Sequence, residues 1–291
     1  MDWDTQVTDF LRTLTTGTRR QYTLALRDFA AWYQQVYAAP PDPALLTTEE
    51  LREWRDHLSD TCELQAATVN QRLAAVKALA RHCGRVVQVK GMKRVAQPIE
   101  PLNGRELGRL LAAAERQQAD ADDPDAGSDW LARRDVALLS LLARSGLRVS
   151  EVVALNVGDV TLNERSGAAL VRKGKGAKER HVALALQARK DLRAYLDVRP
   201  DWPISRLFFS KTGNPLHTRD VQRLVAKFAR LAGITRKVTP HTLRHTFATR
   251  FLRRGGDLAT LQLLLGHANL ATTARYLHPD AARVQEMVEG L

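Results

Sequence analysis

The chain has 291 residues, of which 44% are hydrophobic and 26% charged. This length and composition are typical of about two soluble globular domains rather than of a disordered protein. No apolar run approaches the roughly 20 residues of a membrane-spanning helix, and the acidic N-terminus lacks the apolar stretch of a secretory signal. Two cysteines, Cys62 and Cys83, are too few for a disulfide framework or a structural zinc site. We therefore expect a cytoplasmic protein.

Charge gives the first positive indication of function. The net charge is +12. Residues 1–97 carry 13 basic and 11 acidic side chains, whereas residues 98–291 carry 31 and 21, so most of the excess lies in the second part. A basic surface favours a polyanionic partner, because binding releases the counterions condensed on a nucleic acid. The alternative is a soluble protein that is simply rich in arginine.

The first ninety residues have a helical pattern. Apolar residues recur at helical spacing in four short segments. Capping boxes, Thr-x-x-Gln at 18–21 and Thr-x-x-Glu at 47–50, predict where the second and third helices begin. Together the segments predict a small helical bundle over residues 1–89.

Two stretches have no helix or strand pattern. Residues 90–101 are basic, contain prolines and have no apolar period, which is typical of a linker between domains. Residues 119–129 contain five aspartates and are interpreted as a solvated acidic loop. This loop lacks the Gly and Glu of an EF-hand, so the sequence does not indicate a calcium site.

Residues 102–291 are expected to form a second domain that is mainly helical with a small antiparallel β-sheet. An Asn-x-x-Glu motif at 103–106 predicts the start of its first helix, and a Leu-rich helix over 130–144 should end before a glycine. Residues 168–171 and 181–184 flank a turn rich in Gly and Lys, and this pattern predicts a hairpin.

The segment from Thr239 predicts the start of a helix, where an anion could bind. Thr239 fits the N-cap and Pro240 the first helical position. His241 then lies in the first turn, and Arg244 projects from the same face. The N-terminal end of a helix attracts anions and disfavours imidazolium, so a neutral histidine beside an arginine is suited to act at a phosphate. The alternative is a capping histidine and a surface arginine.

Two further cations lie at predicted turns. Arg148 stands between a helix that ends at Gly146 and a helix that Ser150 caps, where its guanidinium could bind an anion bidentately. The alternative is a salt bridge from this arginine to Glu151. Lys175 lies between two glycines at the tip of the predicted hairpin, where it could approach a ligand closely. A lysine in a turn is more often just solvated.

Two residues near the C-terminus complete the candidates. His267 follows Gly266 at the end of a Leu-rich helix, where its simplest role is that of a C-cap cation. Tyr276 lies on a helix that Pro279 stops, and its alternative role is half-buried packing. None of these residues indicates a function alone.

In combination, these residues closely resemble the tyrosine recombinases, also called the phage integrase family. Five separated motifs occur in the family's order: A-R-S-G-L-R-V-S-E at 143–151, G-K-G at 174–176, H-T-L-R-H-T-F-A-T at 241–249, L-G-H at 265–267 and the tyrosine at 276. The resemblance covers about two-thirds of the chain, from residue 103 to the C-terminus. The short helical N-terminal domain and the total length are most similar to the Xer subgroup.

The resemblance implies how the DNA strand would be cut. Tyr276 would attack a scissile phosphate, which leaves a 3′-phosphotyrosine and a free 5′-hydroxyl. Arg148 and Arg244 would hold the nonbridging oxygens of that phosphate. No cofactor or metal is implied, because guanidinium groups supply the charge stabilisation that metal ions supply elsewhere.

The resemblance also assigns the remaining candidates. Lys175 would protonate the leaving 5′-oxygen. His241 would handle the tyrosine proton, and His267 would hydrogen-bond the phosphate. Because the new covalent bond stores the phosphodiester energy, religation would need no ATP.

At the level of the whole molecule, the resemblance implies a two-domain, C-shaped clamp around double-stranded DNA. A SAM-like core-binding domain would occupy residues 1–89 and the catalytic domain residues 102–291. Four subunits on two sites, either identical or shared with a paralogous recombinase, would exchange strands through a Holliday junction. For the Xer subgroup the resemblance further implies chromosome dimer resolution, and so a role in chromosome partition and cell division, with a DNA translocase as a further partner.

Some features depart from the Xer pattern and keep alternatives open. Tyr276 is followed by Leu277 where Xer proteins usually have Thr, and the acidic stretch 119–129 is longer than usual. An integrase of a mobile element therefore remains an alternative, as do a non-catalytic DNA-binding regulator and a type IB topoisomerase. Residues 281–291 resemble the family's C-terminal helix that docks on a neighbouring subunit; the alternative is a helix packed on its own domain.

Overall fold

The computed structural model describes residues 2–93, 100–121, 129–172 and 179–266. The chain divides into two compact units, Met1–Gln97 and Pro98–Leu291. Each unit has an apolar core of its own. The predicted linker spans the point at which the two units divide.

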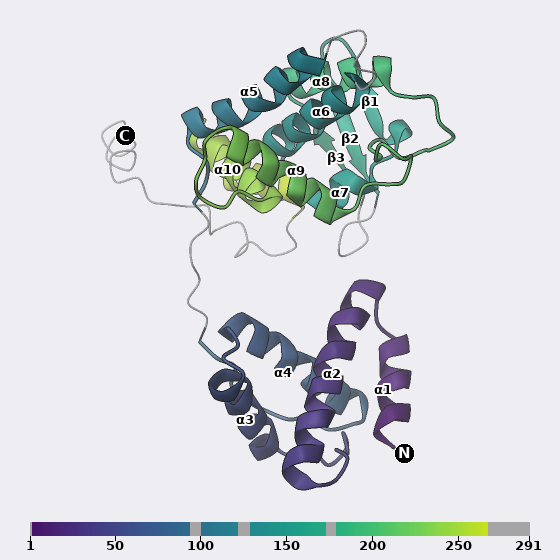
Figure 1. Ribbon diagram of the computed structural model, residues 1–291, viewed down its shortest axis with the longest axis vertical. Coiled ribbons are helices and arrows are strands. Elements are labelled where there is room, and N and C mark those ends of the chain that lie inside the picture. Colours follow the sequence, from purple (N-terminus) through teal and green to yellow (C-terminus); the bar gives the residue numbers. More distant parts are fainter. Residues whose placement is uncertain (1, 94–99, 122–128, 173–178, 267–291) are drawn as a thin grey trace, which may run out of the picture. The chain divides into compact units, whose positions relative to one another are not determined.

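Helices form the described part of the first unit (Figure 1). They are α1 (Trp3–Arg12), α2 (Thr16–Tyr37), α3 (Thr48–Asp56), the π-helical turn η1 (His57–Thr61) and α4 (Ala66–His82). In their core, the buried rings of Phe29 and Trp54 meet edge to face with centroids 4.9 Å apart. At the start of α3, Thr47 and Glu50 exchange the hydrogen bonds of the predicted capping box, at 2.7 and 3.2 Å. The predicted helical bundle is thus confirmed.

The predicted capping box at 18–21 is wrong, because α2 begins at Thr16. The backbone N–H of Arg19 already donates to the Thr15 carbonyl at 2.8 Å, so the helix has formed before residue 18. The early start places the Arg19 guanidinium over the end of α1, where Nε donates to the Leu11 carbonyl at 2.9 Å. The local capping signal at 18–21 is therefore not the start of the helix, and Arg19 instead joins α2 to α1.

The predicted linker is bound to a folded unit at each end. In the first unit, the Asn70 side chain exchanges two hydrogen bonds with the backbone of Met92, at 2.7 and 2.8 Å. In the second unit, Arg236 donates to the carbonyls of residues 100–101 at 2.8 and 2.9 Å. The segment between these anchors comprises residues 93–99.

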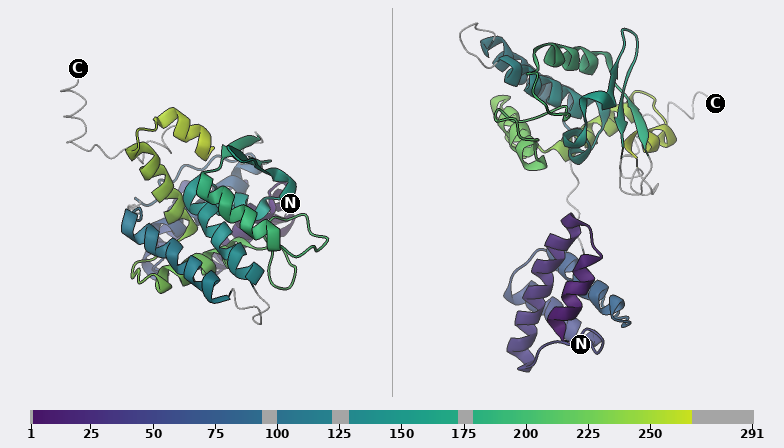
Figure 2. Two further views of the ribbon diagram at one scale, coloured as in Figure 1. Left: turned by 90° about the horizontal axis from the view of Figure 1, so that it is seen from above. Right: turned by 90° about the vertical axis from the view of Figure 1, so that its right-hand side faces the viewer.

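The second unit combines helices with a small sheet (Figures 1 and 2). Its helices are α5 (Gly104–Ala121), α6 (Asp129–Ser145), α7 (Val149–Ala154), the 3-10 turn η2 (Val157–Asp159), α8 (Leu186–Val198), α9 (Thr218–Leu231), α10 (Pro240–Arg253) and α11 (Leu258–Leu265). Its antiparallel sheet has the order β1-β2-β3 and consists of β1 (Val160–Leu162), β2 (Gly167–Val171) and β3 (Arg180–Ala183). The mainly helical fold and the hairpin are confirmed. β1 was not predicted, because three residues are too few for a recognisable strand pattern.

Helix α6 lies in the interior of this unit and packs against α5, α8 and α10. Its fully buried residues are Ala137, Leu138, Leu139, Leu141 and Leu142. A helix that is apolar on nearly all sides belongs in a core. After Ser145, Gly146 turns the chain in the left-handed conformation with a φ of 68°. The end of a rigid core helix thus lies at the motif that carries Arg148.

The predicted acidic loop at 119–129 is wrong at both of its ends. Helix α5 continues to Ala121, and α6 begins at Asp129, so both ends of the stretch are helical. Residues 122–128 lie outside the described residues. The Asp residues obscure the helix ends in the sequence, because Asp is a poor residue for a helix interior.

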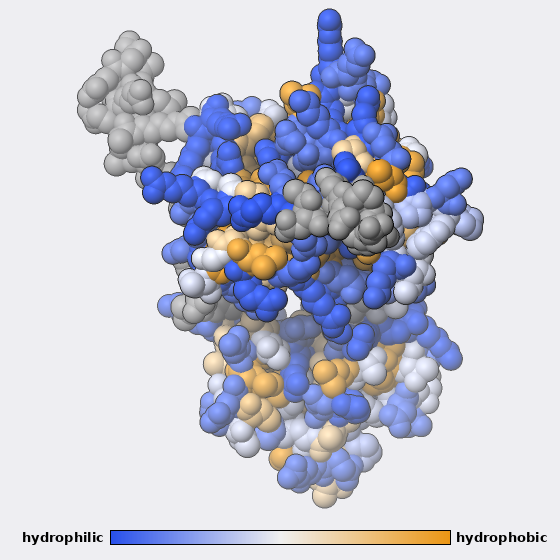
Figure 3. All heavy atoms as spheres, turned by 45° about the horizontal axis from the view of Figure 1, so that its top comes forward, coloured by the Kyte–Doolittle hydropathy of each residue, from blue (hydrophilic) through white to orange (hydrophobic). Residues whose placement is uncertain are grey.

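The helices that the structure describes include none long and apolar enough to cross a membrane. Figure 3 shows one face of the molecule, on which hydrophilic residues predominate and hydrophobic residues occur in small groups. Scattered apolar side chains of this kind are usual on a protein surface.

Candidate active site

The start of α10 carries two of the candidate residues. The Thr239 hydroxyl accepts a hydrogen bond from the Thr242 N–H at 3.1 Å, and Pro240 occupies the first helical position, as the sequence predicts. His241 follows in the first turn and is exposed, whereas Arg244 is buried. The exposed histidine therefore stands where the helix dipole attracts an anion.

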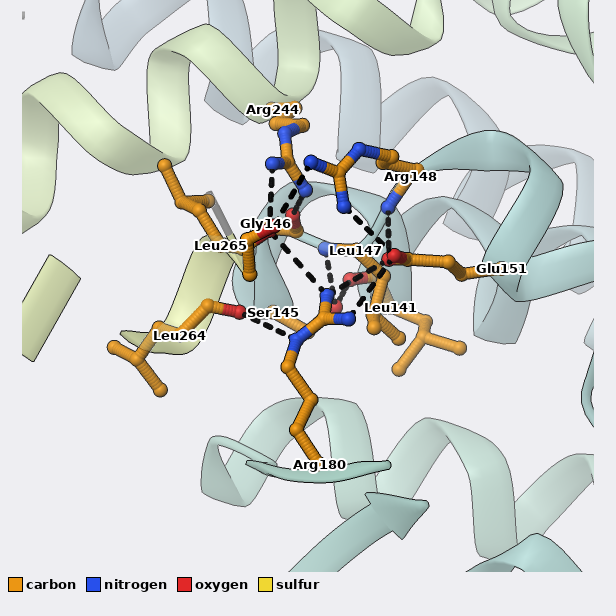
Figure 4. A network of polar contacts seen from close by, with 11 residues as sticks. Leu141, Ser145, Gly146, Leu147, Arg148, Glu151, Arg180, Arg244, Leu264 and Leu265 are labelled. Carbon is orange, nitrogen blue, oxygen red and sulfur yellow. Dashed lines mark hydrogen bonds and ion pairs between the residues drawn. The ribbon is translucent and has the colours of Figure 1, made fainter. Parts of the chain in front are cut away.

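Arg244 connects α10 to the ends of two other helices (Figure 4). Its Nη1 donates to the Gly146 carbonyl after α6 at 2.5 Å, and its Nη2 donates to the Leu265 carbonyl at the end of α11 at 2.8 Å. Gly146 is required at its position, since a Cβ there would lie 2.5 Å from the ring of Phe247. The C-terminal ends of α6 and α11 thus fix the planar guanidinium of Arg244.

Arg148 reaches the same place from the start of α7. It is the N-cap residue, and the Glu151 carboxylate accepts a hydrogen bond from its N–H at 2.8 Å, so the predicted cap at Ser150 is wrong. Its Nη1 donates to Glu151 Oε1 at 2.9 Å and its Nη2 to the Gly266 carbonyl at 3.2 Å. The side chain is 37% exposed, which leaves the guanidinium accessible. Arg148 and Arg244 therefore bind neighbouring carbonyls at the end of α11 (Figure 4).

Glu151 and Arg180 complete this network, and Arg180 was not identified from the sequence. Arg180 extends from β3 and donates from Nη1 to Glu151 Oε1 at 3.1 Å and from Nη2 to Oε2 at 2.9 Å. The Glu151 side chain is only 5% exposed, so two guanidiniums share a buried carboxylate. In the sequence, Arg180 is one of several basic residues around the predicted turn, and nothing there distinguishes it from its solvated neighbours.

These contacts change the acidity of Glu151. Burial opposes ionisation of the carboxyl group, but hydrogen bonds from Arg180 and from Arg148 outweigh it and hold the pKa of Glu151 below its ordinary value of 4.5. A carboxyl group with a lowered pKa in the folded state stabilises the fold above its unfolded pKa. This contribution is lost as the pH falls through the folded pKa.

We therefore expect the substitution Glu151→Gln to make the free energy of unfolding depend less on pH in the acidic range. In the unmodified protein, the free energy of unfolding should decrease as the pH falls below about 4.5, partly because Glu151 takes up a proton. Denaturant unfolding at a series of pH values measures this slope. Identical slopes for the two proteins would contradict the assignment of the shift to Glu151.

The other three candidates lie outside the described residues. Lys175 belongs to the segment 173–178, which joins β2 to β3, and His267 directly follows Gly266. Tyr276 belongs to the segment after residue 266. Within the described ranges, no three His, Cys, Asp or Glu side chains are grouped so that they could hold a metal ion.

Comparison with known families covers both units. Residues 5–85 match the N-terminal SAM-like domain of phage integrases, and residues 100–283 match the phage integrase family. These matches agree with the fold and with the motifs that carry Arg148 and Arg244. The chain belongs to the phage integrase family, the tyrosine recombinases.

Individual relatives are similar along most of their length. Tyrosine recombinase XerC of Chlamydia caviae is 32% identical over 93% of this chain and 92% of its own. Tyrosine recombinase XerC of Brucella melitensis is 34% identical over 96% of this chain and 89% of its own. Among solved structures, the XerH site-specific recombinase bound to palindromic difH substrate in a post-cleavage complex is 25% identical, with a TM-score of 0.74, and covers 93% of this chain and 78% of that chain.

Proposed function

We propose that this chain is a site-specific recombinase that cuts and rejoins double-stranded DNA through a 3′-phosphotyrosine intermediate and a Holliday junction. The observation that carries this proposal is the meeting of Arg148 and Arg244 at the end of α11, directly before His267. Two guanidiniums held in fixed positions suit the two nonbridging oxygens of one phosphodiester.

In the proposed cleavage step, the Tyr276 oxygen bonds to the scissile phosphorus while the bond from phosphorus to the 5′-oxygen breaks. Arg148 and Arg244 stabilise the charge that grows on the nonbridging oxygens, because protein contacts already hold both groups in place. His241 accepts the tyrosine proton, and Lys175 donates a proton to the leaving oxygen. Religation is the same step in reverse, with the 5′-hydroxyl of another strand as the nucleophile.

The location of His241 supports its proposed role. The dipole of α10 disfavours a charged imidazole at His241. A neutral imidazole can accept the proton of a phenol, whose ordinary pKa near 10 otherwise prevents ionisation at neutral pH. His267 would donate a hydrogen bond to the phosphate from the residue next to Gly266, whose carbonyl binds Arg148.

The environments of the other tyrosines support Tyr276 as the nucleophile. The sequence contains five tyrosines. Burial raises the pKa of Tyr33 and of Tyr195 to about 12, and both hydroxyls donate to protein oxygens. The Tyr37 hydroxyl donates to a glutamate, and Tyr22 stacks on a phenylalanine in the first unit. These four side chains therefore have structural partners, and Tyr195, the one in the second unit, is fully buried.

The biological role proposed for this recombinase is the resolution of chromosome dimers in the cytoplasm. Support comes from relatives named tyrosine recombinase XerC that match along nearly their whole length. Four subunits would assemble on two DNA sites, with a paralogous recombinase and a DNA translocase as further partners. The net positive charge of residues 98–291 favours the binding of duplex DNA.

The test has two stages. Selection from a random pool of duplexes identifies the bound sequence, and a nicked suicide substrate with that sequence then traps the cleavage intermediate. We expect two inverted half-sites and a covalent protein–DNA adduct that survives denaturation. Specific binding without an adduct would instead indicate a regulator. Relaxation of plasmids that lack the selected site would indicate a type IB topoisomerase.

Removal of metal ions should not change cleavage. No step of the proposed reaction uses a metal, because Arg148 and Arg244 provide the charge stabilisation. Single-turnover cleavage of the suicide substrate should therefore proceed at the same rate in EDTA and in Mg²⁺ at matched ionic strength. A loss of cleavage in EDTA that Mg²⁺ restores would show that the mechanism is wrong.

A further inference from the structure

Arg180 lies next to the two candidate catalytic arginines without taking part in their proposed contact with DNA. In Figure 4 it approaches Glu151 from β3, on the side away from Arg148 and Arg244. Its side chain is 15% exposed, and it also donates to the carbonyls of residues 264–265 at 3.2 and 3.5 Å. Through these contacts, Arg180 can influence the reaction by way of the residues that it holds.

The first of these influences concerns charge. Arg180 binds both oxygens of Glu151, whereas the Arg148 side chain binds one. A carboxylate and a single guanidinium would have no net charge. With two guanidiniums, the group retains one positive charge that can attract an anion, and the attraction is strong where water is excluded.

The second influence concerns the turn that ends α11. Gly266 has a φ of 61°, and a Cβ there would lie 2.8 Å from Arg180 Cζ, so the guanidinium packs directly against this turn. The Gly266 carbonyl accepts the hydrogen bond of Arg148 Nη2, and His267 is the next residue. Loss of Arg180 would therefore release one of the groups that hold Arg148.

From these contacts we propose that Arg180 is a positioning residue for Arg148. It neutralises Glu151 and supports the end of α11, so that the charge of Arg148 is directed to the scissile phosphate. This inference rests on the proposed recombinase function of the site.

The test compares Arg180→Ala with the double variant Arg180→Ala/Glu151→Gln. Cleavage of the suicide substrate is measured at single turnover, and DNA affinity is measured separately at equilibrium. In Arg180→Ala, the Glu151 carboxylate is left with Arg148 as its one guanidinium partner and should draw it away from the phosphate. The cleavage rate should then fall about tenfold or more, with a smaller change in affinity. In the double variant that carboxylate charge is absent, so cleavage should recover several-fold toward the wild-type rate.

Two more variants complete the comparison. Arg180→Lys keeps the positive charge and should retain more cleavage than Arg180→Ala, although a lysine cannot bind both carboxylate oxygens in the same geometry. Arg193→Ala is the matched control, because Arg193 on α8 also donates to a backbone carbonyl but is exposed and outside the network. It should cleave as the wild type does.

Several results would overturn the proposal. These are a double variant that cleaves no faster than Arg180→Ala, an Arg180→Ala variant with the wild-type rate, or equal losses of cleavage and affinity. Thermal unfolding shows which variants fold. If Arg180→Ala does not fold, the cleavage rates of the wild type, Arg180→Lys and the double variant decide. We expect both variants to retain cleavage. An absence of adduct in the wild type itself would contradict the recombinase function instead.

Discussion

Replacing Tyr276 with phenylalanine is expected to abolish the covalent protein–DNA adduct. The substitution removes the oxygen that would bond to phosphorus and leaves the aromatic ring in place. Loss of a nucleophile costs several orders of magnitude in rate, on the order of 10⁶ where such a residue acts together with its partners. Denaturing electrophoresis of the wild type and the variant with a suicide substrate measures the adduct.

Tyr37→Phe is the matched control for Tyr276→Phe. It also removes one hydroxyl, which in the first unit donates to Glu53. We expect normal adduct formation by Tyr37→Phe and normal DNA affinity for both variants, because neither change removes a basic group. An adduct of normal yield with Tyr276→Phe would show that another residue is the nucleophile.

The substitution Arg244→Ala is expected to have the second largest effect. The loss of one positioned donor to a transition-state oxyanion costs about 3–4 kcal/mol of barrier, or roughly 10²–10³ in rate. Arg244 is also buried, and its removal leaves the carbonyls of Gly146 and Leu265 without this donor. A buried polar group that loses its partner costs about 1–3 kcal/mol, so the variant should also be less stable.

The substitution Arg148→Ala separates the effect on the cleavage rate from the effect on the stability of the fold. Its side chain is 37% exposed, so its loss should reduce cleavage by a similar factor with a smaller loss of stability. Single-turnover rates and thermal unfolding of Arg148→Ala and Arg244→Ala, measured at the same temperature, test this difference. If both variants retain cleavage within a few-fold of the wild-type rate, the arginine pair does not stabilise the transition state.

The sequence was sufficient where a local signal and the tertiary structure agree. Thr239 and Pro240 predicted the start of α10, and the structure has the cap and the helix start at these residues. The paired segments 168–171 and 181–184 predicted the hairpin of β2 and β3. The composition and the turn pattern of this hairpin lie within one short stretch of the chain, so the sequence alone identified it.

The sequence was insufficient where a contact between distant elements decides the structure. Helix α2 begins before the capping box that its sequence suggests, and Arg19 within it contacts the end of α1, a pairing that lies outside any local pattern. Arg180 reaches from β3 to Glu151 on α7, a pairing that no local pattern encodes. Arg148 and Arg244 were identified, but their shared contact with the end of α11 became apparent only in the structure.

The attachment site of the DNA identifies the nucleophile of the cleavage step. The trapped adduct is digested with protease and nuclease, and mass spectrometry locates the residual nucleotide on one peptide. We predict a nucleotide joined through its 3′-phosphate to Tyr276, in the peptide that follows Arg275 after cleavage by trypsin. Attachment to any of the other four tyrosines, to a serine, or through a 5′-phosphate would contradict the account.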